Sequence, residues 1–264
     1  MVQPDEERPA YLRKDGHVAI ITMNRPHAMN AVNAAMSMAM QEAVDEFLAD
    51  PELRVGILTG AGKAFCAGAD LREVAAKRPL IGPDQHERGF GGFTKQLIDK
   101  PLVAAVNGYA LGGGTEFVLA CDLAVMSETA TLGLPEVRHG IIPAGGGLLR
   151  LQRRVPLAIA LEAVMTGAAI SPEEALRWGL VNRVVPADQV LDTAIELAGK
   201  IARNAPLAVQ ASKRVLYQAA AQSDWDAEAW KLSDEAATAI IRTADAKEGP
   251  RAFVEKRAPK WEGR

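Results

Sequence analysis

The sequence predicts an α/β fold that ends in a helical C-terminal region. Short segments rich in Val and Ile alternate with segments of helical periodicity up to about residue 188. Beyond that point nearly every residue is a good helix former, and no long linker separates the two parts. Strands that alternate with helices are typical of an α/β layout, and a run of helices after them indicates a separate helical region.

The expected strands are short runs of apolar residues. "HVAIITMNRP" (17–26) is rich in Val and Ile and is stopped by its last three residues, and "RVGILTGAG" (54–62) ends in glycines. β-branched residues are enriched in strands, whereas Gly and Pro end them. Similar runs lie at 101–108, 123–130 and 180–186.

The expected helices carry recognisable start and stop signals. Residues 31–51 have helical periodicity, and Pro51 fixes the end of this helix. In "SPEEALRWG", Ser171 is a suitable N-cap, a proline follows at the first helical position, and Glu174 stands three residues after the cap. The C-terminal helices are expected at 188–204, 206–222 and 224–259.

The composition limits the class of protein. The chain of 264 residues has a net charge of −3, so no basic excess points to nucleic acid or an anionic membrane. The polar, acidic N-terminus does not resemble a signal peptide, and no apolar run is long enough for a membrane span. Cys66 and Cys121 belong to no CxxC pair, which disfavours a structural zinc site. We expect reduced thiols and a cytoplasmic location, with a disulfide as the alternative.

Two loop segments carry different expectations. The stretch 75–97 has little periodicity and is the best candidate for a mobile loop over a pocket. "AGGGL" (144–148) precedes a basic, apolar helix; we expect a tight connection there, with anion binding as the alternative. The sequence contains no P-loop, no nucleophile elbow and no HExxH motif.

The stretch "VNGYALGGGTEF" (106–117) places three glycines at the expected start of a helix near Thr115. The first amides of a helix have no acceptor inside the helix, and the helix dipole adds positive character there. Without side chains in the way, an oxygen atom of a ligand can approach these amides closely, as in an oxyanion hole. The alternative is close contact of backbone against backbone.

A second corner, "GKAFCAGADLREV" (62–74), has the same design. Small residues at 67–69 follow a strand and precede a helix-like run that starts near Asp70. Each of the two corners can then contribute one amide to the same oxygen atom. Two such donors suit a carbonyl that becomes an enolate or a tetrahedral oxyanion.

Two glutamates accompany these corners. Glu116 falls in the first turn of the helix after the glycines, and Glu136 lies in a proline-containing connection. Isolated glutamates are usually solvated, but the apolar flanks "TEFVLA" and "GLPEV" favour burial. Burial of a pair raises at least one pKa, so that one group holds a proton while the other is ionised. This pattern indicates acid/base chemistry at the carbons α and β to a carbonyl.

These residues resemble the enoyl-CoA hydratase/isomerase (crotonase) superfamily. The matching pieces are "MNRPHAMNAV", "GKAFCAGADL", "KPLVAAVNGYALGGGTE", "CDLAVMSETATLGLPEVRHGIIPAGGG", "EALRWGLVNRVV" and "DAKEGPRAFVEKR", in the expected order across almost the whole chain. The part from "MTGAAISPEEALRWGLVNRVV" to the tail is also similar to the carnitinyl-CoA dehydratase branch. The resemblance implies a crotonase-like spiral of ββα repeats at 1–198 and a helical trimerisation region at 199–264.

The resemblance also implies the roles of individual residues. Ala69 and Gly113 match the two backbone donors to the thioester oxygen. Glu116 matches the glutamate that activates water for attack at the β-carbon, and Glu136 the one that exchanges the proton at the α-carbon. Losing one oxyanion donor typically costs about 10²–10³ in rate.

For coenzyme A, the resemblance implies that the adenine lies near the loop that contains residues 67–71. Arg25 and Lys256 match basic positions that reach phosphates, Lys256 those of a neighbouring subunit, although both also fit ordinary exposed cations. Phe90 and Phe93 match the border of the acyl pocket, with core burial as the alternative. The residues implied in coenzyme A binding are Arg25, Ala28, Ala67, Asp70, Leu71 and Lys256.

The sequence therefore predicts a lyase that hydrates trans-2-enoyl-CoA reversibly and syn, in fatty-acid breakdown or a related acyl-CoA pathway. The alternatives are a crotonase-type isomerase or dehydratase, or an acyl-CoA-binding protein without turnover. No metal and no separate cofactor are expected, because coenzyme A is part of the substrate. A homotrimer or a dimer of trimers is the expected assembly, with no nucleic-acid or membrane partner.

Overall fold

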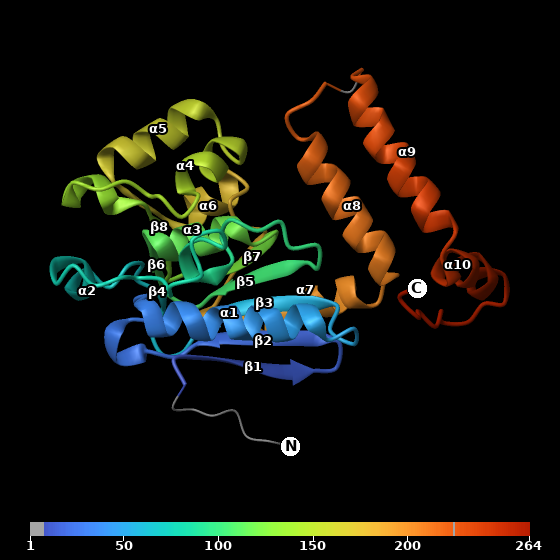
Figure 1. The fold of residues 1–264 in the computed structure, drawn as a ribbon, viewed down its shortest axis with the longest axis horizontal. Helices are drawn as coiled ribbons and strands as arrows, with labels where there is room; N and C mark the ends of the chain where they lie inside the picture. The colour runs from blue at the N-terminus through green and yellow to red at the C-terminus, as the bar shows by residue number, and fades with distance from the viewer. Residues whose placement is uncertain (1–7, 224) are drawn as a thin grey trace. The chain divides into compact units, whose positions relative to one another are not determined.

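The computed structural model describes residues 8–223 and 225–264. The polar segment up to Glu7 and the expected helix start at Asp224 lie outside the described residues. The chain forms two compact units, coloured along the sequence in Figure 1. Unit 1 comprises Met1–Leu97 and Leu102–Ala198, and unit 2 comprises Ile98–Pro101 and Gly199–Arg264.

The larger sheet of unit 1 has six strands in the order β1-β2-β3-β5-β7-β10. β1 pairs with β2 antiparallel, and the other neighbours are parallel. All residues of β2, β3 and β5 are buried, as is typical of parallel strands that are covered on both faces. The strands are β1 (Ala10–Asp15), β2 (Val18–Met23), β3 (Val55–Gly60), β5 (Leu102–Val106), β7 (Leu123–Ser127) and β10 (Arg183–Val185).

A smaller sheet has four strands in the order β4-β6-β8-β9. β4, β6 and β8 run parallel, and β9 is antiparallel to β8. These strands are only two or three residues long: β4 (Ala64–Cys66), β6 (Tyr109–Leu111), β8 (Thr131–Gly133) and β9 (Ala169–Ile170).

The two sheets are linked by a repeated path of the chain. β3 leads to β4 and then to α2 (Leu71–Ala75), and β5 leads to β6 and then to α3 (Gly113–Ala120). β7 leads to β8 and then to the 3₁₀ helix η3 (Pro135–His139). The expected spiral of ββα repeats is thereby confirmed. Because β4, β6 and β8 are parallel neighbours, the three segments that follow them start at the same edge of the small sheet.

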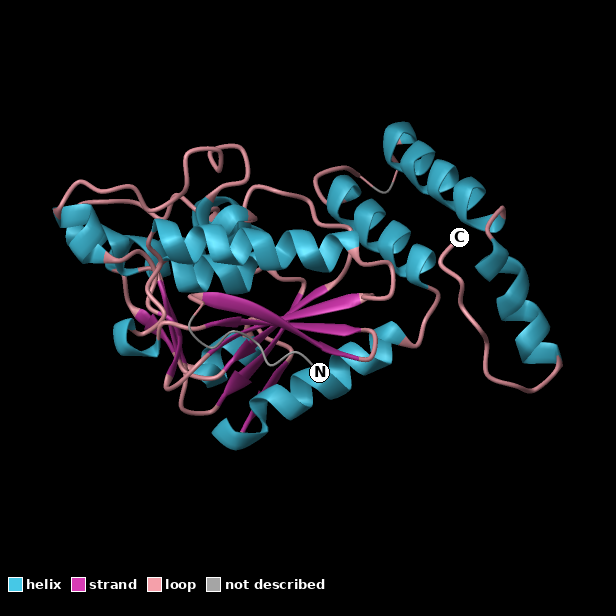
Figure 2. Ribbon diagram, turned by 60° about the horizontal axis from the view of Figure 1, so that its bottom comes forward, coloured by secondary structure: helices cyan, strands magenta, loops and turns pink. Residues whose placement is uncertain are grey.

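Two helices cover the faces of the large sheet, as Figure 2 shows. α1 (Ala34–Ala49) begins at Asn33, whose side chain accepts a hydrogen bond from the amide of Met36 at 3.0 Å, and it buries Met40 and Phe47 completely. α7 (Val190–Ala202) lies on the opposite face and buries residues four apart. Its buried residues in unit 1 are Val190, Ala194 and Ala198.

The remaining helices of unit 1 are short and lie in the connections between strands. The expected capping box is present in α6: the hydroxyl of Ser171 accepts from the amide of Glu174, whose carboxylate accepts from the amide of Ser171. These elements are η1 (Pro26–Ala28), η2 (Phe90–Gly92), α4 (Gly147–Arg150), η4 (Leu151–Arg153), α5 (Leu157–Thr166), α6 (Pro172–Arg177) and η5 (Ala187–Gln189).

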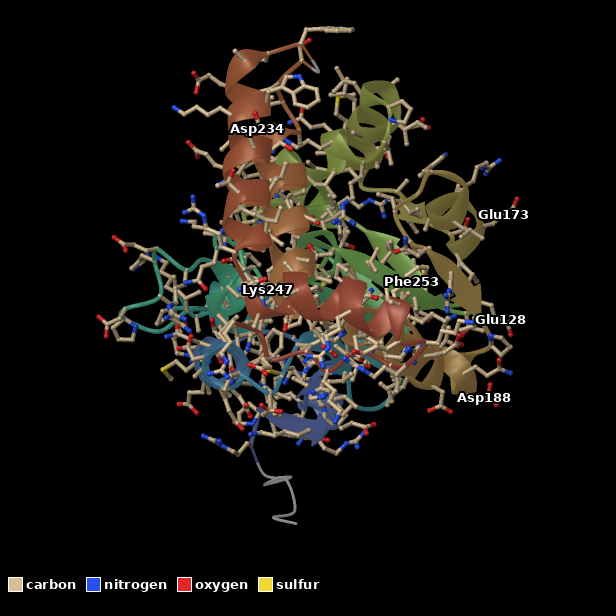
Figure 3. The ribbon with its side chains drawn as sticks, turned by 90° about the vertical axis from the view of Figure 1, so that its right-hand side faces the viewer. Glu128, Glu173, Asp188, Asp234, Lys247 and Phe253 are labelled. Atoms are coloured by element: carbon tan, nitrogen blue, oxygen red, sulfur yellow. The ribbon has the colours of Figure 1, made fainter. Side chains whose placement is uncertain are left out.

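Unit 2 is helical, with α8 (Pro206–Ala219) packed against α9 (Ala227–Ile241) and α9 followed by α10 (Ala244–Val254). The run expected as one segment after residue 224 is divided because Thr243 caps a new helix, accepting from the amide of Ala246 at 3.1 Å. The side chains of these helices are drawn in Figure 3. Within the described ranges no helix combines the length and the apolar character needed to cross a membrane.

Candidate active site

The segments that follow β4, β6 and β8 bring the predicted site residues to one edge of the small sheet. Ala69 stands three positions after β4, Gly113 two positions after β6, and Glu136 three positions after β8. Ligands of open α/β sheets are usually bound beyond the carboxyl ends of the strands. The repeat of the fold, rather than sequence proximity, therefore gathers these residues.

The two glycine-containing corners touch each other. A Cβ atom built on Gly68 would lie 2.6 Å from the carbonyl oxygen of Leu111 and 3.0 Å from the amide nitrogen of Gly113. Any side chain at position 68 would therefore push the corners apart. Gly68 has φ +89°, a backbone region that favours glycine.

The amides of Ala69 and Gly113 are available to a ligand. Ala69 forms a parallel β-bridge with Val32. In this bridge the carbonyl of Gly68 accepts from the amide of Val32, and the amide of Asp70 donates to the carbonyl of Val32. The amide of Ala69 therefore points away from Val32. Gly113 is the first residue of α3, so its amide has no acceptor within the helix. Over residues 8–223 and 225–264, neither amide donates to a backbone or side-chain acceptor outside its own element.

Each glycine of the triplet is required by a different neighbour. Gly112 has φ +54°, and a Cβ atom there would lie 3.0 Å from Oε1 of Glu136. A Cβ atom on Gly113 would overlap the ring of Phe90, and one on Gly114 would overlap the carbonyl oxygen of Cys66. Both interpretations of the triplet thus apply: the backbone approaches other groups closely, and it presents a bare amide.

The start of α3 is fastened to the neighbouring strands. The hydroxyl of Thr115 donates toward the carbonyl oxygens of Ala110 (2.6 Å) and Gly133 (2.8 Å), and it accepts from the amide of Gly133 at 2.9 Å. The amide of Gly112 donates to the carbonyl of Gly133 at 2.8 Å. These bonds fix the position of the Gly113 amide relative to the segment that carries Glu136.

Glu116 is a buried carboxyl group held by backbone amides. It is 3% exposed, and its Oε1 accepts a hydrogen bond from the amide of Gly147 at 2.8 Å. Burial raises the pKa of Glu116 to about 7, and the negative charge of Glu136 adds to this rise. Hydrogen bonds from the amides of Gly147 and Gly145 and the charge of Arg150 act in the opposite direction and favour the carboxylate.

Glu136 is buried with fewer donors. It is 8% exposed, and its Oε2 has no hydrogen-bond partner among the described residues. Burial raises the pKa of this carboxyl group, while its own backbone amide and His139 lower it by smaller amounts. A buried oxygen without a donor favours the protonated acid. The burial that the apolar flanks of both glutamates predicted is confirmed.

In the glycine-rich segment after residue 143, the alternative weighed from the sequence, anion binding, describes the structure better than the favoured one. The segment was expected to be a tight connection, yet the amides of Gly145 and Gly147 bind an anion, and that anion is the Glu116 carboxylate. A Cβ atom on Gly145 would lie 2.5 Å from Oε2 of Glu116, so a side chain there would displace the carboxylate. Consecutive glycines before a helix were the available signal, the same one that marked the triplet in α3.

The segment 75–97, expected to be a mobile loop, is tied to α1. The side-chain amide of Gln85 donates to the carbonyl of Ser37 (3.0 Å) and to Oε1 of Gln41 (2.7 Å), and Arg88 pairs with Asp45 at 2.5 Å. Gln85 is 3% exposed, so these bonds form in a buried position.

The two phenylalanines of that segment lie differently. Phe90 is partly exposed, and its ring stacks on that of Phe117 with 5.2 Å between the centroids. The ring also borders Gly113, and the Cβ atom of Phe90 lies 3.3 Å from a Cβ atom built on Gly145. Phe93 is 2% exposed and also contacts Phe117, at 5.3 Å. Phe93 therefore belongs to the core, and the border of the acyl pocket stays a prediction for Phe90.

The residues expected to bind coenzyme A are mostly gathered in unit 1. The amide of Ala67 donates to Met29, next to Ala28, at 2.9 Å, so the segments 25–32 and 67–71 lie side by side. Arg25 pairs with Asp70 at 3.2 Å, and Asp70 also caps α2. The guanidinium of Arg25 is thus occupied within the fold, and Leu71, 47% exposed, presents an open apolar surface beside it.

Lys256 belongs to unit 2, where it follows α10 with φ +53°. Its expected contact with the phosphates of a neighbouring subunit's coenzyme A stays a prediction. No group of His, Cys, Asp or Glu residues in the described part of the chain is arranged to hold a metal ion. Cys66 and Cys121 are both buried, and neither forms a disulfide.

Fold and site together define a class of protein: an α/β scaffold in which two glycine-containing corners touch each other near two buried carboxyl groups. Such a site can hold an enolate oxygen and move protons at the adjacent carbons. The sequence profile of the enoyl-CoA hydratase/isomerase family matches residues 13–264. The chain belongs to this family, the crotonase family, and is an enzyme of it.

Known relatives cover almost the whole chain. Carnitinyl-CoA dehydratase from Salmonella typhi is 46% identical over 260 residues, which span 96% of this chain and 98% of that protein. The crystal structure of an enoyl-CoA hydratase from Mycobacterium tuberculosis H37Rv has a TM-score of 0.91 at 43% identity, covering 98% of this chain and 100% of that chain. A carnitinyl-CoA hydratase from Mycobacterium avium has a TM-score of 0.78 at 45% identity, over 98% and 100% of the two chains.

Proposed function

We propose that the protein is a hydro-lyase that adds water reversibly and syn across the double bond of a trans-2-enoyl-CoA, giving the 3-hydroxyacyl-CoA. The observation that carries the proposal is the burial of two glutamates, 3% and 8% exposed, beside the amides of Ala69 and Gly113. The family membership and the names of the relatives support the same reaction type.

Glu116 serves as the base toward water. Its carboxylate is stabilised by the amides of Gly145 and Gly147, so it is available in ionised form near neutral pH. A water molecule that donates to this carboxylate loses its proton to Glu116 as its oxygen attacks the β-carbon. A base whose pKa is close to the working pH combines availability with proton affinity.

The amides of Ala69 and Gly113 stabilise the charge that this attack produces. Electrons of the double bond move toward the thioester carbonyl, whose oxygen becomes an enolate oxyanion. Fixed donors in a water-poor site stabilise such a charge without reorganisation. The hydrogen bonds of Thr115 and Gly112 to Gly133 keep one of these donors in place.

Glu136 serves as the acid toward the α-carbon. Its burial and the partnerless Oε2 favour the protonated form that this step requires. Transfer of its proton to the α-carbon collapses the enolate and completes the addition of H and OH. Glu116 then holds the proton and Glu136 is ionised, and the reverse transfer describes dehydration.

The presence of both glutamates separates hydration from its alternatives. Moving a double bond needs one group that takes and returns a proton, whereas addition of water needs a base and an acid at neighbouring carbons. An acyl-CoA-binding protein without turnover needs neither buried carboxyl group, and each costs folding free energy. Two buried acids therefore support the hydro-lyase.

The acyl group is the open part of the proposal. A relative at 46% identity is named for carnitinyl-CoA, which carries a quaternary ammonium group. Aromatic faces bind such groups, and the partly exposed Phe90 ring stands beside the proposed oxyanion site. This observation supports carnitinyl-CoA dehydration as the second candidate activity.

The test is a panel of CoA thioesters followed by ultraviolet absorbance of the conjugated enoyl thioester. Crotonyl-CoA and longer enoyl-CoAs should lose this absorbance on hydration, and carnitinyl-CoA should gain it if it is dehydrated. If the protein binds all these thioesters but changes the absorbance of none, the hydro-lyase proposal is rejected in favour of an acyl-CoA-binding protein without turnover.

We also propose a homo-oligomer, a trimer or a dimer of trimers, in a reducing compartment such as the cytoplasm. Two buried cysteines that form no disulfide support the compartment. Unit 2 exposes large apolar side chains, such as Phe253 of α10, labelled in Figure 3, which is 85% exposed. Exposed apolar patches of this kind mark association surfaces. The exposed apolar residues of unit 2 are Leu216, Tyr217, Trp225, Trp230, Ile241, Phe253 and Val254.

A further inference from the structure

Arg150 ends α4, the short helix whose first residue donates the amide that binds Glu116. α4 runs from Gly147 to Arg150, and its first amide reaches Oε1 of Glu116 at 2.8 Å. The Arg150 side chain folds back over the glycine segment, since a Cβ atom built on Gly146 would overlap its Nη1. The guanidinium therefore lies against the backbone that holds the carboxylate.

The guanidinium joins two loops that border the site. Its Nη1 donates to the carbonyl of Gly145 at 3.4 Å, and its Nη2 donates to the carbonyl of Thr94 at 2.5 Å. Thr94 is 1% exposed and directly follows Phe93. One planar, forked cation thus ties the glycine segment that binds Glu116 to the segment that carries Phe90.

Arg150 also acts on Glu116 through its charge. The charged side chains that act on this carboxyl group are Glu136 from η3 and Arg150 from α4, while His139 acts on Glu136. Glu136 disfavours the ionised form of Glu116, and Arg150 favours it. Contact geometry and charge therefore act on the same group.

We propose that Arg150 is a positioning residue for Glu116: its guanidinium clamps the Gly145–Gly147 backbone to the Thr94 carbonyl and keeps the carboxylate both oriented and ionised. This proposal rests on the proposed function, in which Glu116 is the base. Arg150 does not touch the reacting atoms, and its effect passes through the backbone amides and the electrostatic field.

Neighbouring Arg153 provides the matched control. It lies three residues further along the chain in η4 and is exposed, whereas Arg150 is partly buried. Three variants distinguish a general loss of positive charge from loss of the clamp. R153Q removes a nearby charge only, and R150Q removes both the charge and the clamp. R150K keeps the charge but not the fork that reaches two carbonyls.

The experiment measures kcat and KM for crotonyl-CoA hydration between pH 5 and pH 9, as about four units around neutrality cover the titration of Glu116. R150Q should lower kcat by about 10²-fold with little change in KM, because small displacements of a catalytic group cost rates of this order. Its acid limb in kcat/KM should move to higher pH. R150K should keep the acid limb of the wild type and lower kcat by about tenfold, and R153Q should match the wild type.

A carbon NMR titration of glutamate carboxyl groups supplies a readout that does not depend on turnover, with E116Q identifying the Glu116 signal. In R150Q this signal should titrate at higher pH than in the wild type. An unchanged titration and unchanged kcat in R150Q, or equal losses in R153Q, would overturn the role of Arg150. If R150Q does not fold, R150K decides through its kcat. A wild type that turns over no thioester while the titration shifts as expected would overturn the proposed function alone.

Discussion

Glu116 and Glu136 are two buried acids beside the same glycine triplet, yet the fold surrounds them differently. Glu116 accepts hydrogen bonds from the amides of Gly145 and Gly147, and Arg150 adds a positive charge. Glu136 has a buried Oε2 with no partner in the described residues. Donors aimed at a carboxylate favour its charged form, and their lack favours the acid. Burial raises the pKa of both groups, that of Glu116 to about 7, so in the proposed mechanism the different hydrogen-bond donors, and not the size of the pKa rise, support the roles of base and acid.

The largest expected effect comes from removing the acid. Glu136→Gln should lower kcat by about 10²–10⁴, since the amide cannot give its proton to the α-carbon. Binding of a saturated acyl-CoA, measured by calorimetry, should stay near that of the wild type. Glu128→Gln, at an exposed glutamate labelled in Figure 3, is the control. Wild-type turnover by the Glu136 variant would remove this residue from the mechanism.

A double variant sharpens the comparison. If Glu116 and Glu136 act as one unit, the variant with both glutamines should be little slower than Glu136→Gln alone, because effects of cooperating groups do not add. Each single variant should be close to the double variant in kcat. Fully multiplicative losses would show that the two carboxyl groups act independently.

The next effect concerns the surroundings of Glu116 alone. In Gly145→Ala the new methyl group would stand 2.5 Å from Oε2 of Glu116, so the carboxylate must move. A displacement of about 1 Å at a catalytic group can cost 10²-fold in rate, and we expect kcat to fall by about this amount. Gly199→Ala is the control, as its nearest neighbour is Nη1 of Arg203 at 3.9 Å. A G145A variant as active as G199A would show that the glycine segment does not position Glu116.

A smaller effect is the pH dependence of hydration. Glu116 must be ionised to take a proton from water, and its pKa is about 7. kcat/KM should therefore fall about tenfold for each pH unit well below 7, and this limb should be lost in Glu116→Gln. An acid limb near the ordinary glutamate pKa of 4.5 would contradict the buried state of Glu116.

The large sheet was predictable from the sequence, and the small sheet was not. Apart from β1, every strand of the large sheet falls within a segment that Val and Ile content predicted. The strands of the small sheet have two or three residues, such as "AFC" and "TLG", too few for periodicity or propensity to register. Their pairing is set by the spiral, which only the family resemblance indicated.

The site divides in the same way. The corners at 67–70 and 112–116 were predictable because bare amides before a helix have a local signal. The amides that hold Glu116 come from residues 145 and 147, about 30 positions further on, and the Arg25–Asp70 pair joins residues 45 apart. Such partners depend on tertiary structure, which no local pattern contains.

The smallest expected effect is on stability, where the burial of Glu116 has a cost. Its pKa is raised from 4.5 to about 7. Between pH 4.5 and pH 7 the folded protein therefore keeps a proton on Glu116 that the unfolded chain has lost. The free energy of unfolding should therefore decrease as pH rises from about 4.5 to 7 and stay low above 7. By the usual conversion the full loss is about 3 kcal/mol.

Glu116→Gln removes this titration, so the variant should match the wild type at pH 4 and be more stable at pH 8, by up to about 3 kcal/mol. Urea unfolding at both pH values measures the difference, with Glu128→Gln as the exposed control. A gap that does not widen with pH would contradict the raised pKa of Glu116, because the value of about 7 already includes the amides of Gly145 and Gly147 and the charge of Arg150.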